Sequence, residues 1–435
     1  MYGVVAATST PELEYRPRVV DDEFAELIRQ LPAIVFQGAK AVGKTRTAQR
    51  LAKTAWQLDT EAHLAVALAD PSVLLGGETP VLIDEWQHAP ALWDKVRRAV
   101  DEGATAGAYI LTGSALPKGA GFHSGAGRIV TIRMRPLSLV ERGVERPAVS
   151  LRSLVDGRRP RIEGHSTCDL RRYADEIVGS GFPGMRGLTG RALRAQLDGY
   201  ITHIIDRDFP EFGHKVRKPA VLKRWMTAYA AATATTTAYE KIRDAATSDQ
   251  GEKPAKSVVL PYRDILERLW VLDPVPAWLP TRSHLGRLAQ PPKHHLVDPA
   301  LAARLLGIDA TALVEGMATG PTLPRDGTLL GALFDSLVTQ SVRVYAQHAE
   351  ASVKHLRTAH GEHEVDLVVE RPDGRVVAIE VKLTQVPSDG DLRHLRWLRD
   401  EIKDDLLDAV VITTGSEAYR RPDGIAVVPA ALLGP

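Results

Sequence analysis

A group of glycines followed by a lysine and a threonine is the part of the chain best suited to do chemistry. It lies in the stretch Gln37-Gly38-Ala39-Lys40-Ala41-Val42-Gly43-Lys44-Thr45, which fills every fixed position of the pattern G-x-x-x-x-G-K-[ST]. Glycines in such a loop let successive backbone N–H groups turn toward phosphate oxygens. Lys44 would reach the β- and γ-phosphates, and the Thr45 hydroxyl would ligate Mg²⁺. We therefore predict that this loop binds ATP with Mg²⁺.

A second candidate group is the pair of carboxylates that ends the apolar run Val81-Leu82-Ile83-Asp84-Glu85. A strand here would hold Asp84 near the glycine loop, where it can bind Mg²⁺ directly or through water. Glu85 would then polarise the water that attacks the phosphate. A surface Asp-Glu pair at the end of a strand is the alternative interpretation.

Small hydroxyl residues and an arginine follow farther along the chain. The apolar run Ile110-Leu111 ends in Thr112-Gly113-Ser114. Thr112 or Ser114 would sense the γ-phosphate or hold the water, unless this segment is only a turn. Arg128 would stabilise the charge of the transition state, either in cis or from a neighbouring subunit. A simple surface arginine is the alternative.

The elements that must position these residues are predicted by the apolar pattern. Pro32-Ala33-Ile34-Val35-Phe36, just before the loop, is typical of a buried parallel strand. Residues 47–54 have helical character, and a helix there would turn its positive end toward the phosphates. Further strands at 80–83 and 108–111 alternate with helices. We therefore expect an α/β fold with a parallel sheet covered by helices on both faces.

The composition limits the class of protein. The chain has 435 residues, of which 44% are hydrophobic and 25% charged, values typical of a globular protein with several domains. The net charge of +1 argues neither for nor against a nucleic-acid partner. The single cysteine, Cys168, excludes a disulfide framework and fits the reducing cytosol. Without a secretion signal or an apolar stretch of about 20 residues, we expect a soluble cytoplasmic protein with no membrane partner.

Charged residues near the C-terminal end form another cluster: Asp366, Glu380 and Lys382, with Asp335 upstream. Pro372-Asp373-Gly374 predicts a turn between two β-type runs. With a three-residue hairpin loop, Asp366 lies opposite Glu380, and directly opposed residues share one face. Lys382 lies on that face as well. Two carboxylates and an ammonium there would make a Mg²⁺ site with a lysine to steady an attacking hydroxide.

Taken in order, the N-terminal motifs resemble a widespread prokaryotic family of AAA-superfamily ATPases whose members carry a C-terminal domain of unknown function. The chain departs from that family at Ala39-Lys40, where Pro-Arg is usual. The resemblance implies a P-loop ATPase and extends over nearly the whole chain. Besides the glycine loop, it rests on Leu82-Ile83-Asp84-Glu85-Trp86-Gln87, Leu111-Thr112-Gly113-Ser114, Gly127-Arg128, Pro136-Leu137-Ser138, Gly181-Phe182-Pro183, Arg207-Asp208 and the segment from Tyr262 to Trp278.

The C-terminal cluster is similar to the restriction-endonuclease-like fold, whose pattern is Asp, a spacer and Glu-x-Lys. Asp335 stands where the upstream helix of that fold usually has a glutamate, and Val365 stands where nucleases often have proline. The resemblance implies a metal set of Asp335, Asp366 and Glu380, with Lys382 as a further catalytic residue. The alternative is that these charges line the solvent face of a sheet.

The middle of the chain resembles a winged helix-turn-helix. Residues 239–246 and 256–272 predict two helices joined by a polar loop, and 274–278 predict an extended exit. The second helix would enter a DNA major groove, with Lys253, Lys256 and Arg263 as contacts. Winged helices also bind proteins, and basic clusters often only solvate a helix. A second basic patch that could neutralise phosphates consists of Lys215, Arg217, Lys218, Lys223 and Arg224.

These patterns divide the chain into five expected segments and leave two functions open. The first function is an ATP-driven enzyme that acts on DNA or RNA through its C-terminal site. The second is a nucleotide-controlled switch or scaffold that binds a protein or nucleic acid without cutting it. The sequence leaves the oligomeric state open. The segments are 1–145 (ATPase), 146–215 (linker and helices), 216–285 (winged-helix-like), 286–327 (connection) and 328–435 (restriction-endonuclease-like).

Overall fold

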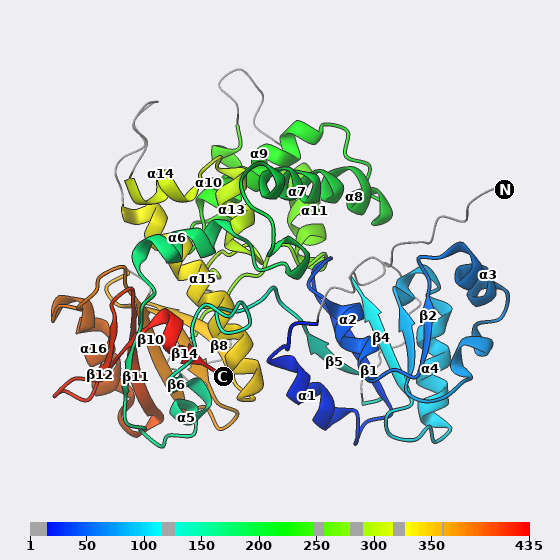
Figure 1. The fold of residues 1–435 in the computed structure, drawn as a ribbon. Helices are drawn as coiled ribbons and strands as arrows, with labels where there is room; N and C mark the ends of the chain where they lie inside the picture. Colours follow the sequence, from blue (N-terminus) through cyan, green and yellow to red (C-terminus); the bar gives the residue numbers. More distant parts are fainter. Residues whose placement is uncertain (1–14, 115–126, 248–255, 279–289, 316–326, 359–360) are drawn as a thin grey trace, which may run out of the picture.

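The chain folds into an N-terminal α/β part, a helical middle part and a C-terminal α/β part (Figure 1). In the figure, the N-terminal part lies at the right, the C-terminal part at the left, and most of the green and yellow middle part above them. The computed structural model describes residues 15–114, 127–247, 256–278, 290–315, 327–358 and 361–435.

The N-terminal part is built on a five-stranded parallel sheet in the order β2-β3-β4-β1-β5. In β1, Ile34 and Phe36 pack in the core shared with α1 and α2, while Ala33 and Val35 pack in the core shared with α3 and α4. Helices therefore cover both faces, and the prediction of an α/β fold is confirmed. The elements are α1 (Val20–Leu27), β1 (Ala33–Gln37), α2 (Lys44–Gln49), β2 (Thr54–Gln57), α3 (Glu61–Ala69), η1 (Pro71–Leu75), β3 (Val81–Asp84), η2 (Trp86–His88), α4 (Ala91–Asp101), β4 (Tyr109–Gly113) and β5 (Val130–Arg133).

The helix after the glycine loop is shorter than the pattern predicted. It was expected over residues 47–54, but α2 ends at Gln49 and β2 already begins at Thr54. The strand forms because residues 54–57 pair in parallel with β3. Such pairing with a distant strand overrides the local helical pattern.

In its described residues, the middle part consists mainly of helices, with two extended stretches that pair with each other. After α11, Leu272 pairs with Leu296 and Val275 with Lys293 in antiparallel bridges. We call residues 271–278 and 290–297 the paired segment. Helices α10 and α11 correspond to the two predicted helices, although α11 ends at Arg268. The helices are α6 (Leu170–Val178), η3 (Pro183–Met185), α7 (Gly190–His203), the π-helix η4 (Ile204–Asp208), α8 (Phe209–Glu211), α9 (Pro219–Ala231), α10 (Tyr239–Ala245), α11 (Lys256–Arg268), α13 (Pro299–Leu305) and α14 (Ala310–Glu315).

The C-terminal part has a seven-stranded mixed sheet in the order β7-β12-β13-β11-β10-β9-β8. Val377 and Ile379 of β10 pack in the core that contains α15, and Val376 and Ala378 pack in the core that contains α16. This sheet is therefore also covered on both faces. Its elements are α15 (Gly327–His348), β8 (Ser352–Arg357), β9 (Glu364–Glu370), β10 (Val376–Val381), η5 (Gly390–Leu392), α16 (Arg393–Ile402), η6 (Lys403–Asp405), β11 (Leu406–Thr413), β12 (Glu417–Arg420), β13 (Ala426–Pro429), η7 (Ala430–Leu432) and β14 (Leu433–Gly434).

The hairpin of β9 and β10 has the predicted register. Glu370 pairs with Val376 and Leu367 pairs with Ile379, so the pairing is centred on residue 373. The connection is longer than the predicted three residues, since it spans residues 371–375. Continued by one residue beyond the pair Leu367–Ile379, this register places residues 366 and 380 across from each other.

The first part of the expected segment 146–215, residues 146–165, is not an irregular linker. They contain β6 (Val149–Ser150), α5 (Leu151–Val155) and β7 (Glu163–His165). β6 pairs with β14, and β7 pairs with β12, which makes it an edge strand of the C-terminal sheet. The strands that β6 and β7 pair with lie near the other end of the chain, so a local sequence pattern could not predict them.

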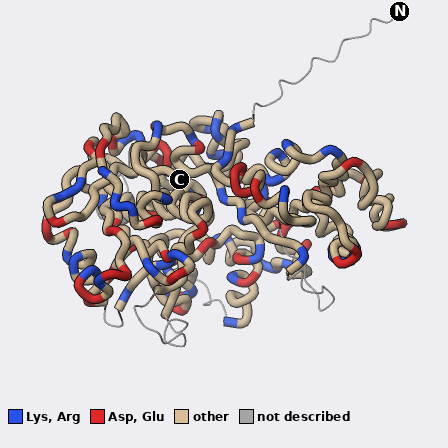
Figure 2. The backbone as a smooth tube through the Cα atoms, turned by 90° about the horizontal axis from the view of Figure 1, so that it is seen from below, with Lys and Arg blue, Asp and Glu red and all other residues tan. Residues whose placement is uncertain are grey.

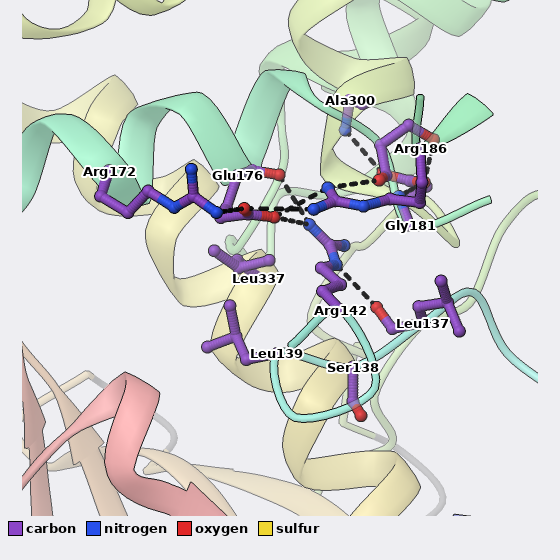
Figure 3. Close-up of polar contacts among 12 residues, drawn as sticks. Leu137, Ser138, Leu139, Arg142, Arg172, Glu176, Gly181, Arg186, Ala300 and Leu337 are labelled. Carbon is purple, nitrogen blue, oxygen red and sulfur yellow. Dashed lines mark hydrogen bonds and ion pairs between the residues drawn. The ribbon is translucent and has the colours of Figure 1, made fainter. Parts of the chain in front are cut away.

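A buried arginine joins the three parts. Arg142 donates to the carbonyl oxygens of Leu137 at 2.8 Å and Glu176 at 2.6 Å, and to the side-chain amide of Gln340 at 3.1 Å. Figure 3 shows Arg142 and Arg186 converging on Glu176, with Leu137 and Gly181 beside them. The motifs at 136–138 and 181–183 therefore meet at a structural joint. Pro183 of the second motif also lies close to Gly43 of the glycine loop.

Candidate functional site

The glycine loop connects β1 directly to α2, so the predicted strand–loop–helix setting is present. Gly38 lies so close to the end of β5 that an added Cβ would stand 2.3 Å from the carbonyl oxygen of Met134. Gly43 has a φ of 103°, in the left-handed region that side chains disfavour. Both positions therefore require glycine, and together they give the loop the curvature that a phosphate needs.

Lys44 is the first residue of α2, and its ammonium lies inside the loop. Nζ donates to the carbonyl oxygens of Gly38 and Ala39, both at 2.9 Å. Burial lowers the pKa of Lys44 to about 8, against the attraction of the Glu85 carboxylate. The buried ammonium is stabilised by two carbonyl oxygens and by carboxylates farther away. A phosphate bound in the loop would bring a negative charge directly to it.

Three oxygen-bearing side chains meet at the carboxyl edge of the parallel sheet. Oδ1 of Asp84 accepts hydrogen bonds from the hydroxyls of Thr45, at 2.9 Å, and Thr112. Burial raises the pKa of Asp84, and these two hydrogen bonds oppose the shift. Carboxylate and hydroxyl oxygens are ligands that Mg²⁺ prefers. The predicted neighbours Thr45, Asp84 and Thr112 are thus brought together.

Glu85 follows β3 in an unusual backbone conformation. Its φ is 53°, in the left-handed region, which costs a residue other than glycine about 1–3 kcal/mol. Its carboxylate accepts hydrogen bonds from the Ser114 hydroxyl, at 3.1 Å, and from the side-chain amide of Gln87. The strained backbone and the two donors fix the carboxylate beside Asp84, where a catalytic base would be needed.

Arg128 does not lie near the loop. The parallel pairing of β1 with β5 places Ile34 beside Val130 and Gln37 beside Arg133, so Arg128 lies near the opposite edge of the sheet. Its guanidinium pairs with Asp101 at 2.5 Å. The predicted role of Arg128 in cis is therefore wrong, because the spacing of Gly127-Arg128 from the loop does not show at which end of β5 the arginine stands.

Arg133 has the position at the loop that was predicted for Arg128. It ends β5 beside Gln37, the residue before the loop. Its guanidinium lies 3.5 Å from the ring centroid of Trp270 and 3.8 Å from Asp273. Among the described residues its two terminal nitrogens have no hydrogen-bond partner. No sequence signal marks Arg133, because it looks like any polar residue at the end of a strand.

The charged residues of the C-terminal cluster do converge. Asp335 comes from α15, Asp366 from β9, Glu380 from β10, and Lys382 follows that strand. Oδ2 of Asp366 accepts from the backbone N–H of Val381 at 2.9 Å, and Nζ of Lys382 donates to Oε1 of Glu380 at 2.7 Å. The face predicted from the hairpin register is therefore present.

An unpredicted residue, Lys293 of the paired segment, lies between two of these carboxylates. Its Nζ donates to Oδ2 of Asp335 at 2.6 Å and to Oδ1 of Asp366 at 2.8 Å, and the residue is 1% exposed. Burial opposes the charge, but the two carboxylates raise the pKa of Lys293, so the side chain stays an ammonium. Burial raises the pKa of Asp335 to about 6, while Lys293 opposes that shift.

The cluster as it stands does not fit a Mg²⁺ ion. Within the described ranges, no group of three His, Cys, Asp or Glu side chains is arranged to hold a metal ion. The Lys293 ammonium takes the position between Asp335 and Asp366 that the ion would need. The predicted metal set of Asp335, Asp366 and Glu380 is corrected accordingly. Lys293 lies 73 residues before Asp366 and follows two prolines, so no local pattern reveals it.

Comparison with known proteins assigns the N-terminal part. Residues 30–142 match the family described as AAA domain. Residues 30–142 are thus similar to that family, and we call them the AAA domain. Residues 170–312 and 330–433 match two further families, each described as a domain of unknown function (DUF8612 and DUF4143).

Relatives extend over most of the chain. One uncharacterised protein of Mycobacterium tuberculosis and one of Mycobacterium bovis are each 25% identical over 421 residues, which is 94% of this chain and 83% of theirs. A Walker-type ATPase of Pyrococcus abyssi is similar over 68% of this chain and 99% of its own, with 14% identity and a TM-score of 0.39.

The AAA domain has residues that fit ATP with Mg²⁺. Gly38 has no Cβ to clash with the backbone of Met134, and Lys44 lies buried within the loop. The Thr45 hydroxyl donates a hydrogen bond to Oδ1 of Asp84. The curved backbone would hold the phosphates, and the oxygens of Thr45 and Asp84 would hold the ion.

Lys40 connects the loop of the AAA domain to the middle part. Its Nζ pairs with Asp208, at the end of η4, at 2.5 Å. The hydroxyl of Tyr200 on α7 also donates to the carbonyl oxygen of Lys40 at 3.3 Å. The Arg207-Asp208 motif therefore reaches the phosphate loop directly, in a contact that the sequence did not predict.

Asp273 of the paired segment forms a second connection to the AAA domain. Its carboxylate lies 2.8 Å from Arg135 and 3.2 Å from Arg343 of α15, besides the longer contact with Arg133. Burial opposes ionisation, but Arg135, Arg343 and Arg133 hold the pKa of Asp273 well below its ordinary range. One buried carboxylate thus ties β5 and α15 to the paired segment.

The predicted nucleic-acid contacts differ in their surroundings. Lys253 lies outside the described residues. Arg263 stacks on Tyr239 at 4.2 Å and pairs with Glu267 at 2.8 Å, so it joins α11 to α10. Lys256 is exposed and lies 3.8 Å from Glu240. Lys215, Arg217, Lys218, Lys223 and Arg224 are all exposed.

Basic and acidic residues are mixed along the described chain. Figure 2 shows Lys and Arg interspersed with Asp and Glu along the tube. In the part of the chain that the structure describes, no helix has the length and apolarity to cross a membrane.

Proposed function

We propose that this protein hydrolyses ATP in its AAA domain and uses the nucleotide state to control the other two parts. The observation that carries the proposal is the arrangement at one edge of the parallel sheet: the Lys44 ammonium inside the loop, the oxygen pair of Thr45 and Asp84, and the Glu85 carboxylate beside them.

Each of these side chains has a role in the proposed reaction. Lys44 would leave the loop carbonyls and contact the phosphates, and Thr45 and Asp84 would hold Mg²⁺, which would supply charge neutralisation at the phosphates. Glu85 accepts a proton from the attacking water. The Ser114 hydroxyl, which donates to the Glu85 carboxylate at 3.1 Å, orients that carboxylate. Arg133, rather than Arg128, stabilises the charge of the transition state in cis.

The test compares two variants by ATP turnover and by calorimetric ATP binding. Lys44→Ala should lose both, because the loop then lacks its cation. Glu85→Gln should still bind ATP but turn it over about 10²–10⁴-fold more slowly, the usual contribution of a general base. Lys53→Ala, an exposed lysine after α2, serves as the control and should behave like the wild type. Wild-type protein without saturable ATP binding would refute the proposal.

The nucleotide state would reach the middle part through Lys40. The loop residue pairs with Asp208 at 2.5 Å, so a shift of the loop around phosphates alters this contact directly. Asp273 gives a second route, because it contacts β5 and α15 together. A winged-helix-like arrangement of α10, α11 and the paired segment would be the part that moves.

We further propose that the moving part binds nucleic acid, and that the protein acts as a switch without cutting it. The exposed basic residues before and within α9, the helix that packs against α10 of the moving part, support the first point. The occupation of the Asp335–Asp366 position by Lys293 favours a non-cleaving switch over a nuclease. The restriction-endonuclease-like fold of the C-terminal part stays a prediction.

ATP turnover with and without duplex DNA or RNA tests this second point. We expect nucleic acid to stimulate turnover, and a Lys215→Glu, Arg217→Glu, Lys218→Glu variant to lose that stimulation while keeping its basal rate. An Arg98→Glu variant, which changes an exposed arginine of α4, should be stimulated normally. If neither DNA nor RNA changes the rate of ATP turnover, nucleic acid is not the partner, and a protein partner is the alternative.

A further inference from the structure

We propose that Trp270 of the middle part is a positioning residue for ATP hydrolysis, because its ring holds the guanidinium of Arg133 beside the phosphate loop. This role rests on the proposed function, in which Arg133 stabilises the charge of the transition state. It goes further in giving the middle part a share of the hydrolytic site, so that the AAA domain does not position its own arginine unaided.

Arg133 is a largely buried cation whose donors are not used up. Its side chain is 14% exposed, and neither terminal nitrogen has a hydrogen-bond partner among the described residues. Burial lowers the pKa of Arg133 well below its ordinary value, and the Asp273 carboxylate opposes the shift. Buried donors are nearly always hydrogen-bonded, so these two nitrogens require an explanation. A guanidinium fork suits phosphate oxygens, which are the acceptors that a nucleotide in the loop would bring.

The carboxylate nearest to this guanidinium is already occupied by other arginines. Oδ2 of Asp273 accepts from Nε of Arg135 at 2.8 Å, and its Oδ1 lies 3.2 Å from Arg343. Arg133 stands 3.8 Å from the same Oδ1, beyond hydrogen-bond distance. Its Cζ instead lies over the ring of Trp270, 3.5 Å from the centroid. Cation–π contacts are strongest with tryptophan and away from water, so the ring can hold the guanidinium without consuming its donors.

Trp270 stands at a position where a helix usually has glycine. It follows the end of α11, and the N–H of Val271 bonds back to the carbonyl oxygen of Leu266 at 2.9 Å. The φ of Trp270 is 60°, in the left-handed region that closes many helices and favours glycine. Residues held in this region cluster at functional sites. Its indole Nε1 has no hydrogen-bond partner among the described residues, so the position makes use of the ring face rather than of the polar atom.

The stacked pair lies beside the phosphate loop. Arg133 pairs in register with Gln37, the residue that directly precedes the loop. Besides burial, the charge of Arg133 lowers the pKa of Lys44, so the two cations lie near each other and would share one anion. Trp270 directly precedes the paired segment, and a movement of that segment would carry the ring with it. The middle part therefore sets the position of a cation that serves the AAA domain.

The experiment is a double-mutant cycle of ATP turnover in the full-length chain. Trp270→Leu keeps an apolar side chain and removes the ring face. We expect kcat to fall about 30-fold, which corresponds to a desolvated cation–π contact of about 2 kcal/mol. KM should stay within about twofold, because the arginine acts on the transition state. In an Arg133→Met background, Trp270→Leu should cause no further loss, since the ring acts only through the arginine.

A conservative variant and a matched control complete the experiment. Trp270→Phe retains an aromatic face and should recover most of the lost turnover. Arg263 of α11 lies over the ring of Tyr239 at 4.2 Å, so Tyr239→Leu also removes a ring from an arginine, but at the contact of α10 with α11. It should turn over ATP as the wild type does. An equal loss in Tyr239→Leu would show a general effect of a lost ring and would overturn the proposal.

The remaining outcomes separate this role from the proposed function. If Arg133→Met is slow but Trp270→Leu folds and keeps the kcat of the wild type, only the role of Trp270 is refuted. A loss that is just as large in the Arg133→Met background would show that the ring serves packing alone. Wild-type protein without ATP turnover refutes both. If Trp270→Leu does not fold, Trp270→Gly, which suits the left-handed backbone, takes its place in the same cycle.

Discussion

Glu380 is a buried carboxylate with a like-charged neighbour. Burial, and next the Asp366 carboxylate, raise the pKa of Glu380 to about 8 from the ordinary value of 4.5, while Lys382 and Lys293 oppose the shift. Between these two values the folded state holds a proton that the unfolded chain has lost. The contribution of Glu380 to stability therefore falls as the pH rises through this range.

Replacing Glu380 with glutamine should flatten this pH dependence, because an amide keeps the shape of the protonated carboxyl but cannot ionise. Urea unfolding at about pH 5.5 and about pH 8 should show a greater loss of stability in the wild type than in Glu380→Gln. The exposed Glu417→Gln is the control and should lose as much as the wild type. Equal losses in all three proteins would show that Glu380 ionises normally.

Arg133 and Arg128 allow a paired test of which arginine serves the nucleotide. Arg133→Met should lower ATP turnover by on the order of 10³-fold, as loss of an arginine at a transition state does, with ATP affinity nearly kept. Arg128→Met should turn over ATP like the wild type, since Arg128 lies near the other edge of the sheet. The opposite result would point to a neighbouring subunit that receives Arg128.

At the residue scale, the predictable part of the site was the part encoded in contiguous residues. Lys44 and Thr45 could be predicted because loop, lysine and hydroxyl have a fixed spacing, and Asp84 because it ends an apolar strand. Arg133 and Lys293 could not, since their positions depend on strand direction and on the path of a distant segment. A lysine that neutralises two carboxylates can stand at any distance from them in the sequence, so no fixed motif reveals it.

Among the elements, the paired segment depends most directly on one residue, Asp273. Asp273→Ala would leave the guanidiniums of Arg135 and Arg343 buried without their carboxylate. We expect this to cost about 3–5 kcal/mol of folding free energy, as breaking a buried ion pair does. Urea unfolding measures the loss, with the exposed Asp400→Ala as the control. A loss within about 0.5 kcal/mol would show that the junction tolerates an unpaired set of arginines.

The sequence predicted a secondary-structure element correctly where the residues that pair with it lie nearby in the chain. The β9–β10 register followed from a turn centred on residue 373. The strands within the expected linker and helical segment 146–215 were not predicted, because β7 forms only by pairing with β12, about 250 residues later. Pairing with a strand elsewhere in the chain also explains why α2 is short: residues 54–57 pair with β3 instead of extending the helix.

For the whole molecule, we expect the middle part to move relative to the AAA domain during the nucleotide cycle. Dyes on Glu102→Cys and Lys241→Cys, both exposed positions, would report the distance by energy transfer in a Cys168→Ser background. The distance should differ between the apo, ATP and ADP states, and Lys44→Ala should abolish the difference. One unchanged distance in all three states would refute the switch.

The entry of β7 into the C-terminal sheet has a consequence for dissection of this protein. A fragment that begins at residue 328 lacks β7, so β12 becomes an open edge, and it also lacks β6, the partner of β14. Exposed edges pair readily with other chains. Such a fragment should aggregate, whereas one that begins near residue 146 retains both strands and should be far easier to keep monomeric.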